Sequence, residues 1–383
     1  MYSKIKYGMV GGGEGAFIGD IHRIAARIDN RYELVAGALS ADADKAARSA
    51  QAIGIDAQRS YASFVEMAAV EKERDDGIDV VVIVTPNHMH FPVAKAFLEQ
   101  GIAVICDKPA TLNLAQAHEL AAIITRTGGF FRLTHNYTGY PLVRYARELV
   151  QEGKLGELRL VQVEYAQDWL SSKEEDTDNK QAKWRTDPSK SGAGGSLGDI
   201  GTHAFNLAQF MSDLTVSEVC ADIDAFVEGR VLDDNAHVLL RFNKEVKGIL
   251  WCSQVAPGNA NALKIRIYGA KGGLEWSQED PNELLFSPLG EPTQKMIRAG
   301  HGISDVANRV SRTPAGHPEG YLEGFANLYS DIADALILHN KGEPIPAELQ
   351  LIPGIKEGVA GLQFVESVVE SSKNNSQWVS LNA

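Results

Sequence analysis

The chain has 383 residues, which is too long for one ordinary hydrophobic core and predicts two domains. Hydrophobic residues make up 44% and charged residues 23% of the sequence, a composition that excludes a disordered or fibrous protein. The 37 basic and 50 acidic residues leave a net charge of -13, which repels phosphate backbones and anionic lipids, so we expect no nucleic-acid partner.

Apolar runs are short and broken by charge, far below the roughly 20 residues that cross a bilayer, so no membrane span is predicted. The first residues run directly into a strand pattern without a secretion signal, and we expect a cytoplasmic protein. Cys106, Cys220 and Cys252 lie in strand-like runs without CxxC spacing. This pattern favours reduced thiols, with neither a disulfide nor a metal site.

The N-terminal segment predicts a strand over residues 5–11, a glycine-rich turn and a helix over 17–28. Gly11, Gly13 and Ala16 match the G-x-G-x-x-G/A pattern, in which glycines turn the chain and admit a pyrophosphate, and a small third residue packs helix on strand. The helix N-terminus offers N–H groups to the anion. The segment predicts a dinucleotide site with contacts from Gly11, Gly13, Gly15, Ala16, Phe17 and Ile18.

Further strands are expected at residues 32–39, 79–85, 103–107 and 130–134, with helical patterns between them. The unbroken apolar run 80–84 is typical of a parallel strand covered on both faces. We therefore predict an α/β doubly wound Rossmann sheet, which binds ligands at the C-terminal ends of its strands. The polar residues expected there to contact the cofactor are Ser40, Thr85, Pro86, Asn87, His90, Asp107, Lys108 and Asn136.

Ser40 stands where the second strand normally distinguishes NAD from NADP. An acidic residue there binds the ribose hydroxyls of NAD, whereas a small residue with a nearby cation accepts the 2′-phosphate of NADP. Asp42 follows two residues later, and Lys45 and Arg48 lie in the next helix. The two cofactors stay open, with a preference for NAD because Asp42 can reach a ribose.

After about residue 140 the pattern changes to a helix at 142–152 and longer alternating strands at 158–167, 216–226, 236–242, 248–254, 263–268 and 284–287. Alternation predicts an antiparallel or mixed sheet with one covered face. We expect a Rossmann domain over residues 1–138 and an α/β domain with an open sheet over 139–383. The uncovered face of that sheet predicts a homodimer or homotetramer.

Two long segments of this second part are expected to be loops. Residues 171–191 are charged and poorly periodic, and two interpretations of Trp184-Arg185 stay open: a cover over a sugar or dinucleotide, or a surface arginine resting on a packed tryptophan. Residues 296–320 precede a helix expected from 322 to 337. His317 in that loop is either a substrate contact or part of a turn into the helix.

The residues suited to proton transfer are Asp199, His203 and Lys108. In a helix, Asp199 and His203 would share one face, and an imidazole is the side chain best suited to exchange a proton near neutral pH. The alternative is a helix-capping aspartate followed by a core histidine. Lys108 follows a buried strand and precedes a proline, a position from which it could stabilise an alkoxide, although a solvated lysine at a turn has the same pattern.

Together, the glycine turn, Thr85-Pro86-Asn87, Asp107-Lys108-Pro109, Trp184-Arg185 and the run from Gly194 to His203 resemble the Gfo/Idh/MocA oxidoreductases. The resemblance implies a Rossmann domain, an open-sheet domain and a catalytic set of Lys108, Asp199 and His203, with His203 as acid/base. It also implies a cis bond at Lys108-Pro109. Tyr137, Lys108, Asp199, His203 and His317 are the expected substrate contacts.

Two departures from the family pattern affect the site: Asp107 replaces the usual glutamate, and His135-Asn136-Tyr137 replaces an arginine-rich motif. The expected activity is hydride transfer between a nicotinamide and a ring hydroxyl or ketone of a sugar, glycoside or cyclitol. Two alternatives remain: an NAD-dependent glycosidase that oxidises C3 transiently, and a non-catalytic dinucleotide-binding sensor.

Overall fold

A computed structural model describes residues 4–381 and divides the chain into two units. The first unit contains residues 1–136 and 321–359, and the second contains 137–320 and 360–383. This division differs from the single boundary expected at 138/139, because residues 321–359 return to the first unit. No helix in the described part of the chain is both long and apolar enough to span a bilayer.

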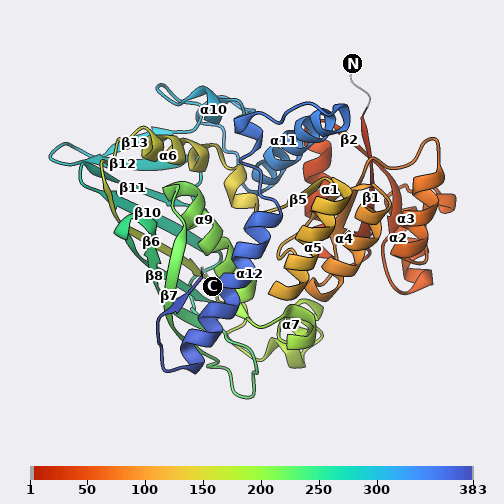
Figure 1. The fold of residues 1–383 in the computed structure, drawn as a ribbon, viewed down its shortest axis with the longest axis horizontal. Coiled ribbons are helices and arrows are strands. Elements are labelled where there is room, and N and C mark those ends of the chain that lie inside the picture. The colour runs from red at the N-terminus through yellow and green to blue at the C-terminus, as the bar shows by residue number, and fades with distance from the viewer. Residues whose placement is uncertain (1–3, 382–383) are drawn as a thin grey trace. The chain divides into compact units, whose positions relative to one another are not determined.

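The first unit is built on a five-stranded parallel sheet in the order β2-β1-β3-β4-β5, which confirms the predicted doubly wound fold (Figure 1). Chain order reverses between β1 and β3, the place where such sheets bind their ligands. Its strands are β1 (Ile5–Gly11), β2 (Tyr32–Ala38), β3 (Val80–Val84), β4 (Ala103–Cys106) and β5 (Phe131–Leu133). Its helices are α1 (Phe17–Ile28), α2 (Ala43–Ala52), α3 (Phe64–Glu73), α4 (His90–Glu99), α5 (Leu114–Thr127) and α11 (Tyr321–Lys341).

The return of α11 to the first unit has a packing reason. Its apolar side chains, among them Phe325, Leu328 and Ile332, join one buried cluster with residues of β1 and β3. Tyr329 accepts or donates a hydrogen bond of 2.8 Å with Nδ1 of His22 on α1. Helical periodicity identified this helix correctly, but the sequence does not show which sheet an amphipathic helix will cover.

The second unit contains a nine-stranded sheet in the order β13-β12-β11-β10-β6-β9-β8-β7-β14, antiparallel except for the pair β6 and β9. Figure 1 shows these strands side by side, and α9 packs against β6, β9 and β10. The strands are β6 (Leu158–Ala166), β7 (Val216–Asp224), β8 (Asn235–Phe242), β9 (Lys247–Ser253), β10 (Ala262–Gly269), β11 (Gly272–Ser277), β12 (Glu283–Pro288), β13 (Gln294–Ile297) and β14 (Val379–Ser380). The helices are α6 (Pro141–Gln151), α7 (Lys180–Arg185), α8 (Pro188–Ser191), α9 (Thr202–Ser212) and α10 (Asp305–Asn308), and α12 (Ile355–Lys373) crosses the division at 359/360.

Residues 171–191 are not the continuous loop that was expected. They contain α7 and α8, and each begins at a side-chain cap: Asn179 accepts from the N–H groups of Gln181 and Ala182, and Asp187 accepts from that of Ser189. Caps satisfy N–H groups that a short helix leaves without partners, so they stabilise helices too short to show apolar periodicity.

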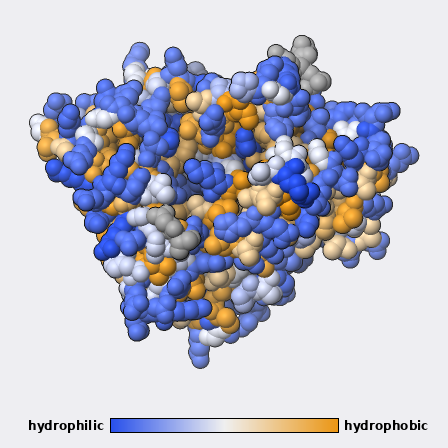
Figure 2. All heavy atoms as spheres, in the orientation of Figure 1, coloured by the Kyte–Doolittle hydropathy of each residue, from blue (hydrophilic) through white to orange (hydrophobic). Residues whose placement is uncertain are grey.

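Hydrophilic residues cover much of the face drawn in Figure 2. One carboxylate of the first unit is buried instead. Glu71 accepts hydrogen bonds from Nε of Arg59 (3.0 Å), the hydroxyl of Tyr61 (2.7 Å) and the N–H of Ile78 (3.2 Å). It thereby ties the end of α3 to the segments on either side of it.

We expect Glu71→Ala to lower the free energy of unfolding by about 3–5 kcal/mol, because it leaves the buried guanidinium of Arg59 without its main carboxylate. Urea unfolding measures this change. Glu66→Ala, an exposed position on the same helix, is the control and should change stability by less than about 0.5 kcal/mol. Equal losses in the two variants would contradict a special role for the buried ion pair.

Candidate active site

The turn after β1 has the backbone that a dinucleotide cradle requires. Gly11, Gly12 and Gly15 adopt positive φ values of 80°, 73° and 77°. Helix α1 then begins at Phe17, and its N-cap residue Ala16 makes no side-chain hydrogen bond to the helix. The N–H groups of the first turn are therefore not capped by that side chain, which suits a bound pyrophosphate.

The close contact between this turn and its helix is made by glycines. A Cβ atom at Gly19 would lie 2.5 Å from the Cα of Gly12. At Gly13, a Cβ would lie 2.7 Å from the carbonyl oxygen of Leu39, at the end of β2. The sequence pattern assigned helix packing to Ala16, whereas the structure places the closest approach one turn later, at Gly19.

The other predicted cofactor residues near this turn have different surroundings. Phe17 is 62% exposed, and Ile18 packs against the core. The hydroxyl of Ser40 accepts from the N–H of Asp42 (3.1 Å), and the Asp42 carboxylate caps α2 by accepting from Lys45 (2.8 Å). Asp42 therefore already has a structural partner.

Asp107 follows β4 and carries a stabilised negative charge. Burial opposes that charge, but the nearby imidazole of His22 and the positive charge of Lys108 hold the pKa of Asp107 well below its usual value. His22 Nε2 lies 3.9 Å from the carboxylate, and the hydroxyl of Thr134 donates to it at 3.1 Å. Asp107 is therefore ionised beside the predicted catalytic lysine.

His90 connects the ends of two neighbouring strands. One ring nitrogen lies 2.8 Å from the carbonyl oxygen of Thr85, after β3, and the other lies 2.5 Å from that of Pro109, after β4. The ring is buried, and burial lowers the pKa of His90. The Lys108-Pro109 bond is cis, as the family resemblance implied. His90, predicted as a cofactor contact, thus also holds the backbone next to Lys108.

Two buried polar atoms at this edge of the sheet have no hydrogen-bond partner within the described residues: Oγ1 of Thr85 and Nδ2 of Asn136. Both residues were predicted to contact the cofactor. Buried polar groups nearly always have partners, so their presence beside the glycine turn fits a polar ligand such as a dinucleotide. Asn87 is also buried here, and Pro86 begins the same turn after β3.

His135, at the end of β5, was noted in the sequence only as part of a motif. It is buried, and burial together with the nearby charge of Lys108 lowers its pKa to about 3. The imidazole is therefore neutral at physiological pH. The sequence signal that could have identified His135 is its position after a strand, at the edge of the sheet where ligands bind.

In the second unit, Asp199 lies in a single π-helical turn (Leu197–Gly201) that leads into α9. Oδ2 of Asp199 accepts hydrogen bonds from Nε2 of Gln254 (2.9 Å) and Nε of Arg185 (3.2 Å). The guanidinium of Arg185 also lies 4.3 Å from the ring centre of Trp184. Of the two interpretations of Trp184-Arg185, the contact with Asp199 favours a place in the site. Single π turns are frequent at functional sites.

His203 lies on the first turn of α9 and packs edge-on against Tyr137, with ring centres 4.9 Å apart. The hydroxyls of Tyr137 and Tyr165 are hydrogen-bonded at 2.5 Å, and Tyr165 donates to Oδ1 of Asn261 at 2.7 Å. Burial raises the pKa of Tyr137, so its hydroxyl stays protonated at neutral pH. The predicted Tyr137, Asp199 and His203 therefore belong to one region of the second unit.

Three amide side chains complete this region and were missed from the sequence. Nε2 of Gln254 donates to Oε1 of Gln167 (3.2 Å), and Nε2 of Gln167 donates to Oδ1 of Asn261 (2.8 Å). Gln167 and Gln254 directly follow β6 and β9, the parallel pair. The rule applied to the first sheet, that ligand-binding residues follow parallel strands, also holds here, but the sequence does not show that β6 and β9 pair in parallel.

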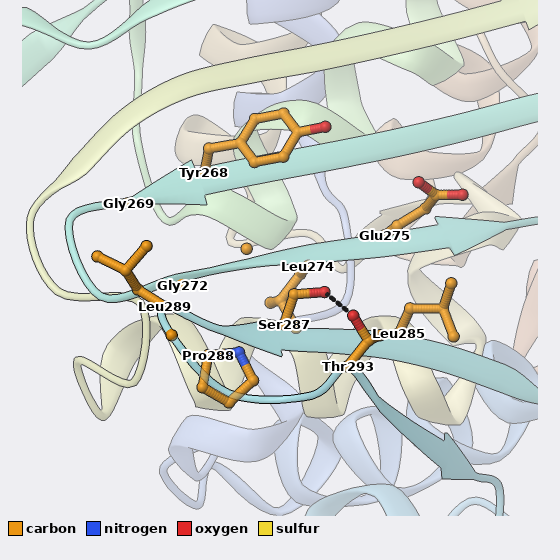
Figure 3. Close-up of a pocket in the computed structure, with 12 residues that line it drawn as sticks. Tyr268, Gly269, Gly272, Leu274, Glu275, Leu285, Ser287, Pro288, Leu289 and Thr293 are labelled. Atoms are coloured by element: carbon orange, nitrogen blue, oxygen red, sulfur yellow. Dashed lines mark hydrogen bonds between the residues drawn. The ribbon is translucent and has the colours of Figure 1, made fainter.

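His317 is exposed, and its carbonyl oxygen accepts from the guanidinium of Arg298 (2.5 Å). A role for its side chain in substrate binding stays a prediction. A cavity of about 480 Å³ also lies in the second unit, between β10, β11 and β12 (Figure 3). It is lined by glycine and apolar residues together with Tyr268, Glu275, Ser287 and Thr293, and neither Asp199 nor His203 lines it.

The comparisons with known proteins agree with this geometry. Residues 5–135 match the family described as "Oxidoreductase family, NAD-binding Rossmann fold", and residues 143–275 match "GFO/IDH/MocA C-terminal domain". The uncharacterized oxidoreductase YfiI of Bacillus subtilis is 34% identical over 378 residues, which cover 98% of this chain and 96% of YfiI. The chain belongs to the GFO/IDH/MocA oxidoreductase family.

Solved structures of similar proteins cover this family member from end to end. An oxidoreductase from Sinorhizobium meliloti is 51% identical, with a TM-score of 0.90 and coverage of 99% of this chain and 100% of that one. An inositol dehydrogenase homolog from Azotobacter vinelandii, complexed with NADH and myo-inositol, is 34% identical, with a TM-score of 0.92 and coverage of 99% and 98%. The first unit is thus an NAD-binding domain of an oxidoreductase.

Gly19→Ala should weaken NAD⁺ binding, because the added Cβ pushes α1 away from the glycine turn. We expect the Kd for NAD⁺, measured by isothermal titration calorimetry, to rise about tenfold, or about 1.4 kcal/mol of binding free energy. The matched control is Gly361→Ala in α12, where a Cβ meets nothing within 4 Å. Both substitutions raise helix propensity by about 1 kcal/mol. An unchanged Kd in Gly19→Ala would contradict the tight-packing role.

His135 should make stability depend on pH. Its folded pKa of about 3 lies below the unfolded value of about 6.5, so between these values only the unfolded chain binds the proton. This contribution is complete above about pH 6.5 and is lost as pH falls toward 3. At pH 5 the loss is about 2 kcal/mol.

His135→Gln should therefore reduce the difference in unfolding free energy between pH 7.5 and pH 5 by about 2 kcal/mol, measured by urea unfolding. His118→Gln, at an exposed position on α5, serves as the control and should keep the wild-type pH dependence. If His135→Gln also keeps the wild-type pH dependence, the buried imidazole of His135 does not cause that dependence.

Proposed function

We propose that this oxidoreductase transfers a hydride between NAD and a ring hydroxyl or ketone of a sugar, glycoside or cyclitol. The observation that carries the proposal is the hydrogen-bonded series from Asp199 through Gln254, Gln167 and Asn261 to Tyr165 and Tyr137, which lies beside His203. Amides and hydroxyls both donate and accept, which matches a ligand that presents several hydroxyl groups. The similar Azotobacter protein bound to myo-inositol supports this substrate class.

In this proposal His203 is the acid/base that takes the proton from the substrate hydroxyl, or returns it in the reverse direction. Imidazole suits the task because it exchanges a proton near neutral pH. Asp199, held by Gln254 and Arg185, keeps its carboxylate in a defined orientation for the substrate or for His203. Bound NAD supplies the hydride acceptor at its nicotinamide ring.

Lys108 is proposed to stabilise the negative charge that develops on the substrate oxygen. Ionised Asp107 precedes it, and the bond to Pro109 is held by the contact between His90 and the Pro109 carbonyl. A cation whose backbone is fixed in this way needs no rearrangement when charge develops.

We propose that the cofactor is bound by residues of the first unit at the turns after β1, β2, β3, β4 and β5, supported by the glycine turn and the unsatisfied atoms of Thr85 and Asn136. The proposed contacts are Gly11, Gly13, Gly15, Ala16, Phe17, Ile18, Ser40, Thr85, Pro86, Asn87, His90, Asp107, Lys108 and Asn136. Trp184 and Arg185 of the second unit are proposed as further contacts. Tyr137 and His317 are proposed to contact the substrate.

A homodimer or homotetramer through the nine-stranded sheet also belongs to the proposal. Leu160, Leu239, Ile249 and Tyr268 are large apolar residues that remain 39–47% exposed, and they lie on adjacent strands. An apolar band across a sheet face is typical of a surface covered by a second copy.

The test is an assay of NADH formation from NAD⁺ with a panel of sugars, glycosides and inositols. His203→Asn should lower kcat by about 10²- to 10⁴-fold and leave the Kd for NAD⁺ unchanged, because it removes the proton acceptor and not the cofactor site. His118→Asn, far along the sequence on the exposed face of α5, should keep wild-type kcat. Wild-type kcat in His203→Asn would refute the assignment, and release of a leaving group without net NADH would instead identify a glycosidase.

A further inference from the structure

Asp233 is a buried carboxylate that the proposed reaction does not use. It precedes β8 and is 8% exposed. Its carboxylate accepts three hydrogen bonds from consecutive residues: the N–H of Gly195 (2.7 Å), the hydroxyl of Ser196 (2.8 Å) and the N–H of Leu197 (2.8 Å). The carbonyl oxygen of Asp233 accepts a fourth, from the N–H of Ser196 (2.9 Å).

Gly195, Ser196 and Leu197 lead into the turn that carries Asp199, and the helix that carries His203 follows that turn. The turn begins at Leu197, and its first backbone bond runs from the N–H of Asp199 to the carbonyl of Gly195 (2.9 Å). The donors of Gly195, Ser196 and Leu197 all lie within four residues of Asp199. A buried carboxyl group that accepts three hydrogen bonds from one short segment holds that segment in place, because each donor would otherwise lose its partner.

The Gly195–Leu197 segment packs tightly against Asp233. A Cβ at Gly195 would lie 2.1 Å from the carbonyl oxygen of Asp233, so this position requires glycine. At the other end of the turn, a Cβ at Gly201 would lie 3.0 Å from Sγ of Cys252 on β9. Gly195 thus packs on the backbone of Asp233, and Gly201 packs on the side chain of Cys252.

The Asp233-Asp234 segment also holds Gln254, whose side chain donates a hydrogen bond to Asp199. The carbonyl of Asp234 accepts from the N–H of Gln254 (2.8 Å), and the Gln254 side chain donates to Asp199 (2.9 Å). The segment at 233–234 therefore fixes both the backbone that bears Asp199 and the backbone of the amide that orients its carboxylate.

We propose that Asp233 is a positioning residue for the reaction, which sets the location of Asp199 and His203 by anchoring the Gly195–Leu197 backbone through its carboxylate. The inference rests on the proposed function for its kinetic consequence, but the anchoring itself does not depend on substrate identity. An asparagine cannot replace the carboxylate, because its NH₂ group would face a donor where the structure requires an acceptor.

The test compares Asp233→Asn with Glu71→Gln. Glu71 is 2% exposed and likewise accepts a backbone N–H group, from Ile78 (3.2 Å), together with the Tyr61 hydroxyl (2.7 Å) and Nε of Arg59 (3.0 Å). It belongs to the first unit, and none of these hydrogen bonds involves the Gly195–Leu197 segment. The two variants therefore compare a buried carboxylate that anchors the catalytic turn with a buried carboxylate that anchors a different part of the chain.

We expect Asp233→Asn to lower kcat roughly tenfold to hundredfold, the scale expected for a small displacement of catalytic groups, with no change in the KM for NAD⁺. Glu71→Gln should lose thermal stability but retain kcat. If Asp233→Asn does not fold, Ser196→Ala removes one donor and should give a smaller loss of kcat, again with an unchanged KM for NAD⁺. Equal kcat losses in Asp233→Asn and Glu71→Gln would overturn the proposal.

A readout without substrate separates this inference from the proposed function. In ¹⁵N-histidine-labelled protein, the His203 ring signal, assigned by its disappearance in His203→Asn, should shift in Asp233→Asn and stay in place in Glu71→Gln. This result would hold even if every polyol failed as a substrate. An unmoved His203 signal in Asp233→Asn would refute the anchoring role regardless of activity.

Discussion

The constraint on which this structure depends is that parallel strands end together. In the first unit, β1, β3, β4 and β5 run parallel, so the residues that follow them gather at one edge of the sheet. The second sheet obeys the same rule on a smaller scale, because the parallel pair β6 and β9 ends at Gln167 and Gln254. The backbone groups of a parallel strand are engaged in the sheet. The side chains that follow the strand are therefore available to bind one another or a ligand.

Buried titratable groups are the second requirement, and hydrogen-bond donors and charged side chains of the protein surround them. Burial raises the pKa of Asp233, while the N–H groups of Leu197 and Gly195 and the Ser196 hydroxyl act in the opposite direction. At Asp107 the neighbouring positive charges outweigh burial, and its pKa falls. At His135 burial and Lys108 act together, and the ring stays neutral. The surroundings therefore favour the ionised form of Asp107 and the neutral form of His135, whereas at Asp233 burial and the donors act in opposite directions.

The sequence allowed much of this to be predicted, and the failures have physical causes. The strand, glycine turn and helix over residues 5–28 were identified because periodicity and glycine spacing are local signals. Helices α7 and α8 were missed because their caps, not an apolar face, stabilise them. Gln167, Gln254 and Asn261 were missed because amides mark a site only when strand pairing brings them together, and pairing is a property of the fold. The roles of individual site residues remain predictions.

The return of α11 to the first unit shows how a late segment supports an early site. Tyr329 on α11 is hydrogen-bonded to His22, and the other ring nitrogen of His22 faces Asp107. A first unit cut at residue 138 would lack both this hydrogen bond and the apolar side chains that α11 adds to the core. Removing large buried side chains typically costs 2–5 kcal/mol each, and a domain is stable by only about 5–15 kcal/mol. The N-terminal sheet therefore depends on residues more than 180 positions later in the chain, and so does the environment that keeps Asp107 ionised beside Lys108.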